Sequence, residues 1–201
     1  IAEPFAFNPE WSADVNGLRY LRISSTSAPR LISWFLYFPP QDDVYARYAI
    51  FIEDDVADGM TELGVKLPGL AGDEVSWRME HGPLAPANRG LYAAVDYLYN
   101  AESGSGYGAI RSMGVVLRAG RWYTIEQHIK LNTPGKADGI GQVWVNGNLV
   151  WESQSVRYRN NAASRVNHLH VNVYHGGLGA VKAPILYRIA RIGVSRNYIG
   201  P

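Results

Sequence analysis

The sequence predicts an all-β protein, a two-sheet antiparallel β-sandwich of the concanavalin-like β-jelly-roll type. Short apolar or alternating segments recur along the chain, turn residues separate them, and helical periodicity is almost absent. The 201 residues include 21 glycines, 11 prolines, 13 tyrosines and 6 tryptophans, a composition that favours many short strands and turns. Because no internal repeat or linker interrupts this pattern, we expect one β-jelly-roll domain over residues 1–201.

Charge and composition exclude several classes of function. The formal net charge is +1, so nothing in the chain calls for a nucleic-acid or membrane partner. There is no cysteine, which removes disulfides, thiol catalysis and thiolate metal sites. No apolar run approaches membrane-spanning length. The chain starts at Ile1 rather than Met, and no signal segment is visible.

The first half of the chain contains three clear strand signals. Residues 30–38 are apolar and aromatic and end at a Pro-Pro-Gln-Asp-Asp turn. Residues 45–53 alternate, with Tyr48, Ile50 and Ile52 on one side. The acidic loop at 54–60 is interpreted as a solvated turn, in preference to a structural calcium site, because its oxygen spacing fits no calcium-loop motif.

The second half continues the pattern. Strands are expected at 91–100, 122–131, 165–177 and 186–194. Residues 122–131 alternate most cleanly, which predicts one buried and one wet face and places His128 at the surface. Asn146-Gly147 indicates a hairpin, with Trp144 opposite Leu149 and Val143 opposite Val150.

Charged residues in the stretch 62–80 need a separate explanation. It is predicted to form two short strands joined by a turn, since Pro68, Gly69, Ala71, Gly72 and Asp73 are poor ladder residues. Alternation puts Glu62, Gly64 and Lys66 on one face, and Ser76, Arg78 and Glu80 on one face of the next strand. A solvated sheet face explains this pattern as well as a binding site does.

The segment 167–177 carries a second polar row. Leu169, Val171 and Val173 are expected to face the core, so that the opposite face carries His168, His170, Asn172 and Tyr174. His175 alternates toward the core side, although the following Gly-Gly could free it from the strand. The two histidines could hold a metal, but no carboxylate lies beside them in sequence, so a sugar groove is favoured and no metal is expected.

Several motifs together resemble alginate and glucuronan lyases, polysaccharide lyase families fourteen and twenty. They are Lys-Leu-Pro-Gly-Leu at 66–70, Ser-Trp-Arg-Met at 76–79, Tyr-Leu-Tyr at 97–99, Leu-Asn-Thr-Pro-Gly at 131–135, Val-Trp-Val-Asn-Gly at 143–147 and Val-Tyr-His-Gly-Gly at 173–177. The resemblance covers roughly residues 45 to 199 and is that of a distant member. It implies a jelly roll that cleaves a polyuronate by β-elimination in a concave cleft. It also implies that the active site consists of Lys66, Ser76, Arg78, Tyr97 and Tyr99.

The residues suit this chemistry on independent grounds. Elimination removes the proton on C5, next to the uronate carboxylate, and expels the glycosidic oxygen. Because the intermediate carries a second negative charge, a cation at the carboxylate is needed, and Arg78 with Lys66 beside it is the natural candidate. Candidates for the base are Tyr97, Tyr99, Tyr174 and His170. We assign substrate binding to Glu62, Ser76, Glu80, Asn172, Tyr174 and His175.

The expected protein is therefore a secreted or periplasmic polysaccharide lyase. It would act as a monomer, without a cofactor, on an anionic polysaccharide such as a glucuronan- or alginate-like 4-linked polyuronate. The alternative is a non-catalytic, lectin-like glycan-binding module, because aromatic and polar rows serve binding equally well. The set Lys66, Arg78, Tyr97 and Tyr99 favours the enzyme, since pure binding does not need ionisable groups that converge on one point.

Overall fold

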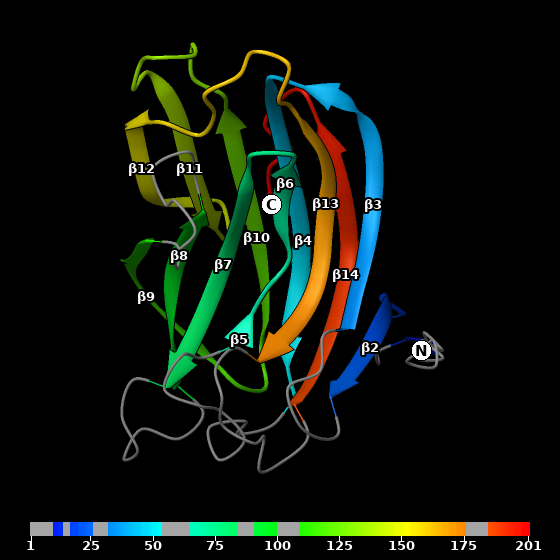
Figure 1. Ribbon diagram of the computed structural model, residues 1–201. Helices are drawn as coiled ribbons and strands as arrows, with labels where there is room; N and C mark the ends of the chain where they lie inside the picture. The colour runs from blue at the N-terminus through cyan, green and yellow to red at the C-terminus, as the bar shows by residue number, and fades with distance from the viewer. Residues whose placement is uncertain are drawn as a thin grey trace, which may run out of the picture.

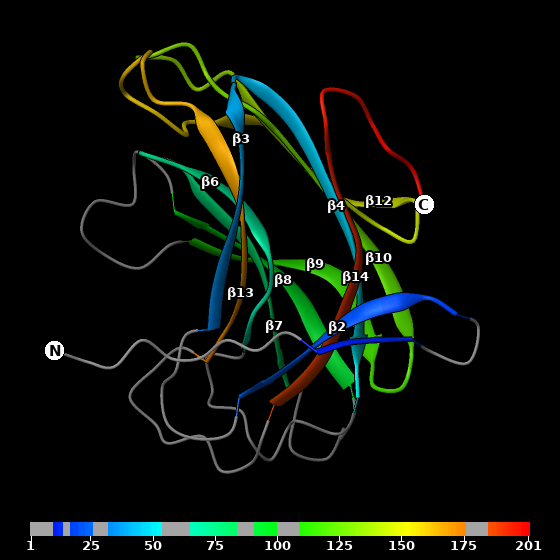
Figure 2. The ribbon, with the colours of Figure 1, turned by 90° about the vertical axis from the view of Figure 1, so that its right-hand side faces the viewer.

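The computed structural model describes residues 10–13, 17–25, 32–53, 65–83, 91–99, 109–175 and 185–201. These residues form fourteen strands and no helix, so the described part of the chain has no helix that could cross a membrane. The strands build two seven-stranded sheets that face each other (Figures 1 and 2). The pairs of strands within them are antiparallel. The predicted two-sheet antiparallel sandwich is therefore confirmed.

The first sheet has the spatial order β1, β2, β14, β4, β10, β11, β12. The bounds are β1 Glu10–Ala13, β2 Arg19–Ser25, β14 Ile185–Ser195, β4 Asp43–Ile52, β10 Trp122–Lys130, β11 Gly139–Val145 and β12 Asn148–Val156. The predicted strands at 45–53, 122–131 and 186–194 lie here. Strands β1 and β2 have no counterpart among the predicted elements.

The second sheet has the order β3, β13, β5, β7, β8, β9, and a further short strand, β6, pairs with both β13 and β7. The bounds are β3 Ile32–Gln41, β13 Val166–His175, β5 Val65–Lys66, β6 Gly69–Gly72, β7 Ser76–Pro83, β8 Leu91–Tyr99 and β9 Ala109–Arg118. Figure 1 shows β5 and β6 one above the other between β13 and β7. Strand β9 was not among the predicted elements.

One apolar core fills the space between the sheets. Strand β4 contributes Tyr48, Ile50 and Ile52, all fully buried, as its alternation predicts. The second sheet contributes Leu98 of β8 and Leu169 of β13, which are also fully buried. The inner face of the second sheet is thereby identified, and residues that alternate with Leu98 and Leu169 lie on its outer face.

The turn predicted between the two strands of 62–80 is partly wrong. Residues Gly69–Gly72 form β6, whose Leu70 and Ala71 pair with Leu169 and His168 of β13. Glycine is what permits this approach, because a Cβ at Gly72 would lie 2.0 Å from the backbone oxygen of Arg165.

The strand predicted at 30–38 is longer than expected. Strand β3 continues through Pro39 and Pro40 to Gln41, so the turn begins at Asp42. In the described part of the chain, β3 is the outermost strand on its side of the sheet. A proline is tolerated in an outer strand because its missing N–H disturbs few ladder bonds.

The Asn-Gly hairpin is confirmed, but its register differs by one residue. Asn146 and Gly147 have φ values of 51° and 78°, as a tight hairpin turn requires. Trp144 lies opposite Leu149 as predicted, whereas Val143 pairs with Trp151 rather than Val150. The register shifts between Val143 and Trp144, because a bulge leaves one residue of β12 unpaired there.

The surface position predicted for His128 is wrong. Its ring is buried and stacks on Tyr45, with centroids 4.0 Å apart and planes at 2°. Its Nδ1 lies 2.7 Å from Gln142 Oε1, and its Nε2 lies 2.7 Å from Asp43 Oδ1. Neighbours on β4 and β11 therefore cover this part of the outer face.

Glu126, on the same face as His128, is also buried. Its carboxylate accepts hydrogen bonds from the backbone N–H groups of Ile199 (2.7 Å) and Gly200 (3.0 Å). Burial raises the pKa of Glu126, and the two N–H donors oppose that shift. Alternation alone predicts a wet face here, because it does not show that the end of the chain returns to cover it.

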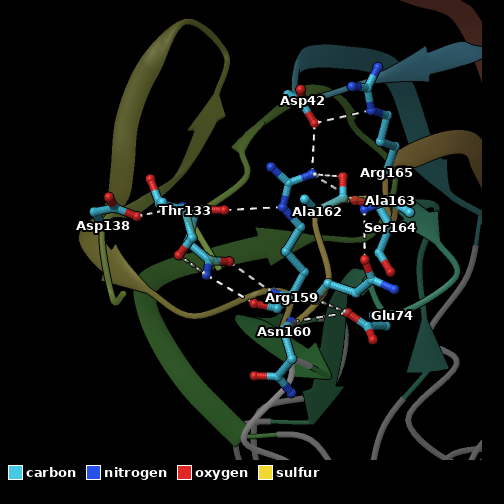
Figure 3. Close-up of polar contacts among 12 residues, drawn as sticks. Asp42, Glu74, Thr133, Asp138, Arg159, Asn160, Ala162, Ala163, Ser164 and Arg165 are labelled. Carbon is cyan, nitrogen blue, oxygen red and sulfur yellow. Dashed lines mark hydrogen bonds and ion pairs between the residues drawn. The ribbon is translucent and has the colours of Figure 1, made fainter. Parts of the chain in front are cut away.

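Arg159 joins three connections at one end of the sandwich (Figure 3). Its Nε donates to the backbone oxygen of Asn132 (3.1 Å), in the β10–β11 connection. Its Nη1 donates to the backbone oxygen of Ser164 (2.8 Å) and to Asp42 Oδ1 (2.8 Å), in the β3–β4 turn. The guanidinium is nearly buried, so these contacts compensate for the loss of water and tie both sheets together.

Glu74 holds the neighbouring β6–β7 turn against the same connection (Figure 3). Its Oε2 accepts hydrogen bonds from the backbone N–H groups of Asn160 (3.0 Å) and Asn161 (3.3 Å). The bond from Asn160 is the main reason that the pKa of Glu74 lies below its ordinary value.

We expect the Glu74 contact to stabilise the fold in a pH-dependent way. A carboxyl whose pKa is lowered by folding stabilises above its unfolded-state pKa, and this contribution is lost as the pH falls through the folded-state pKa. Glu74→Gln should therefore lower the melting temperature slightly at neutral pH, and the difference from wild type should vanish in acid. Asp73→Asn, which removes the adjacent exposed carboxylate, is the control. A Glu74→Gln deficit that persists unchanged below the acidic transition would contradict this account.

Candidate active site

The outer face of the second sheet carries a lysine–tyrosine contact. Lys66 of β5 is 92% removed from solvent, with an exposed fraction of 8%, and its Nζ donates a hydrogen bond to the hydroxyl of Tyr99 of β8 at 3.0 Å. The same Nζ lies 5.0 Å from the centroid of the Tyr99 ring. The Lys66 ammonium therefore contacts both the hydroxyl oxygen and the aromatic ring of Tyr99.

Strand register shows what lies beneath this contact. Lys66 pairs with Glu80 of β7, and Tyr99 pairs with Ser76 of the same strand. We call each line of paired residues across the strands a row. Lys66 and Tyr99 are thus paired with positions four residues apart along β7, and their side chains extend toward each other. The row midway between them pairs Arg78 with Tyr97. The hydrogen bond thus spans the register position of Arg78.

The remaining neighbour of Lys66 is β13. Tyr174 pairs with Lys66, so Tyr174 and the residues that alternate with it, Asn172, His170 and His168, occupy positions on the same face as the lysine. Leu169 and Val171 are buried on the other face, as the sequence predicts. The two polar rows expected from separate parts of the sequence thus share one face of one sheet.

The segment that follows Lys66 is held from the opposite sheet. The ladder is interrupted between β5 and β6 at residues 67–68, where Pro68 has no N–H to donate. Gln127 of β10, which is buried, fills this gap: its Nε2 donates to the backbone oxygen of Pro68 (3.1 Å), and its Oε1 accepts from the N–H of Leu70 (3.4 Å). One core amide therefore satisfies a carbonyl within the break and an N–H of β6.

His170 lies on the same face as the lysine. It pairs with Phe35 of β3 and Gly69 of β6. Its neighbour on this face, His168, shares a register row with Tyr99 through Ala71 and Ser76, whereas Tyr174 shares a row with Lys66. His170 therefore lies between these two rows, on β13. Its ring is buried against Phe35, with centroids 4.5 Å apart and planes at 18°.

The other candidate residues are placed as follows. The positions of Ser76, Arg78, Glu80, Tyr97, Asn172 and Tyr174 share the outer face with Lys66 and Tyr99, by register. His175 pairs with Val65 and so alternates with this set, as the sequence indicates. Glu62 lies outside the described residues, as does the acidic loop at 54–60.

Two aromatic residues on this face were missed. Phe35 and Tyr37 of β3 lie beside His170 and His168, and both are exposed. The segment 30–38 was interpreted as a plain apolar strand. Its alternation could have separated Phe35 and Tyr37 from Trp34 and Leu36, but sequence does not show that β3 lies next to β13.

No metal site was predicted, and the described residues contain no group of three histidine, aspartate or glutamate side chains that could hold a metal ion. The two histidines of the considered alternative, His168 and His170, have ring centroids 6.3 Å apart, and each packs against Phe35. The absence of a metal or other cofactor stays a prediction.

Comparison with solved structures first confirms the jelly-roll fold. Alginate lyase Aly36B is 16% identical, with a TM-score of 0.69 over 93% of this chain and 86% of that chain. The marine PL-14 alginate lyase from Aplysia kurodai is 17% identical, with a TM-score of 0.63 over 88% and 82%. The endo-β-1,4-glucuronan lyase from the fungus Trichoderma reesei is 12% identical, with a TM-score of 0.60 over 88% and 80%.

A family comparison matches part of the sequence. The model of the family described as Polysaccharide lyase 14 matches residues 94–183, which include Tyr97, Tyr99, His170 and Tyr174. Lys66 and Arg78 precede the matched residues in sequence. In the sheet, Lys66 pairs with Tyr174 and Arg78 pairs with Tyr97, both of which lie within the match. No curated protein matches the chain. These findings confirm the predicted resemblance to polysaccharide lyases of the family-fourteen type.

Gln127→Leu tests the anchor beneath Lys66. It keeps the side chain's bulk but leaves Pro68 C=O and Leu70 N–H without their partner in the core, at a cost of about 1–3 kcal/mol for each unsatisfied group. We expect a clear loss of unfolding free energy in denaturant and faster hydrogen exchange at the Leu70 amide. Ile129→Val, a core change on the same strand worth about 0.5–1.5 kcal/mol, is the control. Exchange at Leu70 that is equally slow in Gln127→Leu and Ile129→Val would show that Gln127 does not hold this segment.

Proposed function

We propose that the chain cleaves a 4-linked polyuronate, glucuronan- or alginate-like, by β-elimination on the outer face of the second sheet. The observation that carries this proposal is the hydrogen bond of 3.0 Å between Lys66 and Tyr99, which spans the register position of Arg78. Anionic polysaccharide is also the substrate class named for the alginate and glucuronan lyases that share the fold. A lectin-like binding module has no such support, because binding alone does not need this pair.

The reaction requires charge neutralisation before proton transfer. Removing the C5 proton of a uronate places a second negative charge next to the carboxylate, so a preorganised cation there lowers the barrier. We assign this role to Arg78, whose planar guanidinium can donate two parallel hydrogen bonds to a carboxylate. Its place in the middle of β7, one row from both Ser76 and Glu80, puts it at the centre of the polar face.

Proton transfer is assigned to the Lys66–Tyr99 pair. The C5–H bond breaks, its electrons form the C4=C5 double bond, the C4–O4 bond breaks, and O4 leaves with a proton. Two groups that exchange protons therefore have to act at neighbouring atoms, C5 and O4. We assign the base to Tyr99, which as a phenolate takes the C5 proton, and the acid to the Lys66 ammonium, which donates a proton to O4. The hydrogen bond between them then passes the proton of Tyr99 back to Lys66.

The proposal extends to setting and partners. A secreted or periplasmic enzyme that acts as a monomer, without nucleic-acid or membrane partners, fits the near-neutral charge of +1. The direct test is a panel of alginate blocks, glucuronan and other polyuronates, followed by ultraviolet absorbance of the unsaturated product. Absorbance that rises with at least one polymer is the expected result. Retention of a polymer with no product from any of them would indicate a binding module instead.

Tyr99→Phe tests the proton-transfer assignment. It removes one hydroxyl and keeps the ring, so polymer binding should survive while turnover falls by about a hundredfold or more, the usual contribution of general acid–base catalysis. Tyr198→Phe, an exposed tyrosine that follows β14, is the matched control and should retain full activity. Tyr97→Phe and His170→Ala distinguish the other candidates. Normal turnover in Tyr99→Phe would remove Tyr99 from the chemistry.

Arg78→Lys tests the carboxylate contact. The substitution keeps the charge but loses the planar fork, so activity should fall by about tenfold or more, as expected when one strong hydrogen bond of 1.5–3 kcal/mol is lost. The measurement is kcat/KM on the substrate identified in the panel. Near-normal kcat/KM would exclude a bidentate role for Arg78.

A further inference from the structure

Two aromatic side chains are exposed on the edge of the sheet that carries Lys66. Phe35 is 40% exposed and Tyr37 is 69% exposed, and their rings stack with centroids 5.9 Å apart and planes at 27°. Beneath them lie His170, stacked on Phe35 at 4.5 Å, and His168, 5.5 Å from Tyr37. We call Phe35, Tyr37, His168 and His170 the aromatic ledge.

The ledge and the Lys66–Tyr99 pair belong to one surface. Phe35 pairs with His170 and Tyr37 pairs with His168, and these histidines alternate in phase with Tyr174, which pairs with Lys66. Tyr37 shares a register row with Tyr99, through His168, Ala71 and Ser76, so the two tyrosines are separated across the strands by four strand spacings, roughly 19 Å. This separation is larger than one pyranose ring, so a sugar on the ledge would not be the sugar whose bond is cleaved.

The packing of the ledge suits a flat apolar surface rather than a knob or a pocket. Phe35 lies at 18° to His170 and at 27° to Tyr37. His170 is buried, so Phe35 and Tyr37 are the two rings of the stack that are exposed to solvent. A pyranose ring has an apolar face of C–H groups, and an aromatic ring is the protein surface that complements it.

We propose that the aromatic ledge is a remote subsite that stacks on a uronate ring of the same polymer whose bond is cleaved at Lys66 and Tyr99. The proposal rests on the proposed function, because it takes its ligand from the reaction assigned above. The ledge adds affinity for chains long enough to reach it and contributes nothing to shorter ones. The enzyme should therefore prefer polymer over short oligosaccharides.

Binding without turnover is the primary test. In a Tyr99→Phe background, Phe35→Ala/Tyr37→Ala should weaken retention by immobilised or gel-embedded polyuronate by about tenfold, since two aromatic contacts are lost. Leu149→Ala, which truncates an equally exposed side chain (48%) on β12 of the other sheet, is the control and should bind as the parent does. Equal retention in the double variant and its parent would overturn the proposal.

Chain-length dependence is the second test. With Tyr99 intact, Phe35→Ala/Tyr37→Ala should lower kcat/KM on polymer by about tenfold and leave kcat/KM on a trisaccharide unchanged. An equal loss on both substrates would show that the ledge acts at the cleaved bond and would overturn the remote role. Tyr37→Ala alone, at the most exposed position, provides the same comparison if the double variant does not fold.

The two proposals can fail separately. If no polyuronate is cleaved but the double variant still loses retention, the proposed reaction is wrong and the ledge is a glycan-binding surface. If cleavage is normal and neither retention nor chain-length preference changes, the ledge proposal alone is wrong. Analytical sedimentation tests whether a second copy of the chain covers the ledge instead. A wild-type dimer that dissociates in Phe35→Ala/Tyr37→Ala would make the ledge a contact between two copies and would also overturn the proposal.

Discussion

The candidate site depends on one buried amide, that of Gln127. Strands β5 and β6 follow each other in the same position of the second sheet, between β13 and β7. The ladder is broken between them at residues 67–68. A break in the middle of a sheet would leave backbone groups buried without partners, which is costly. Gln127 reaches across the core from β10, donates to the carbonyl of Pro68 within the break and accepts from the N–H of Leu70 in β6. The segment that follows Lys66 is thereby tied to the packing of the whole sandwich.

Local patterns predicted the parts of the fold that depend on alternation alone. The burial of Tyr48, Ile50 and Ile52, and of Leu169 and Val171, follows from side chains that alternate along a strand. The hairpin at Asn146-Gly147 follows from turn chemistry within two residues. These features are short-range, so one sequence is enough to find them.

Features that depend on which strand lies beside which could not be predicted. Lys66 and Tyr99 were selected by resemblance, but their hydrogen bond across β7 requires the order β5, β7, β8. Phe35 was not selected because nothing in 30–38 shows that β13 is its neighbour. His128 was assigned to the surface because its strand alternates, although packing from β4 and β11 covers it. In each case the missing information is long-range pairing.

The two prolines near the end of β3 have a consequence for solubility. An outer strand with exposed apolar rings offers its free backbone edge to strands of other molecules, and such edges promote aggregation. Successive N–H groups along a strand point to opposite sides, so one of the consecutive residues Pro39 and Pro40 removes a donor from the free side. Strand β3, which exposes Phe35 and Tyr37, therefore also contains a proline that hinders pairing of its outer edge with a strand of another molecule. A protein that keeps apolar rings exposed on an outer strand benefits from this arrangement.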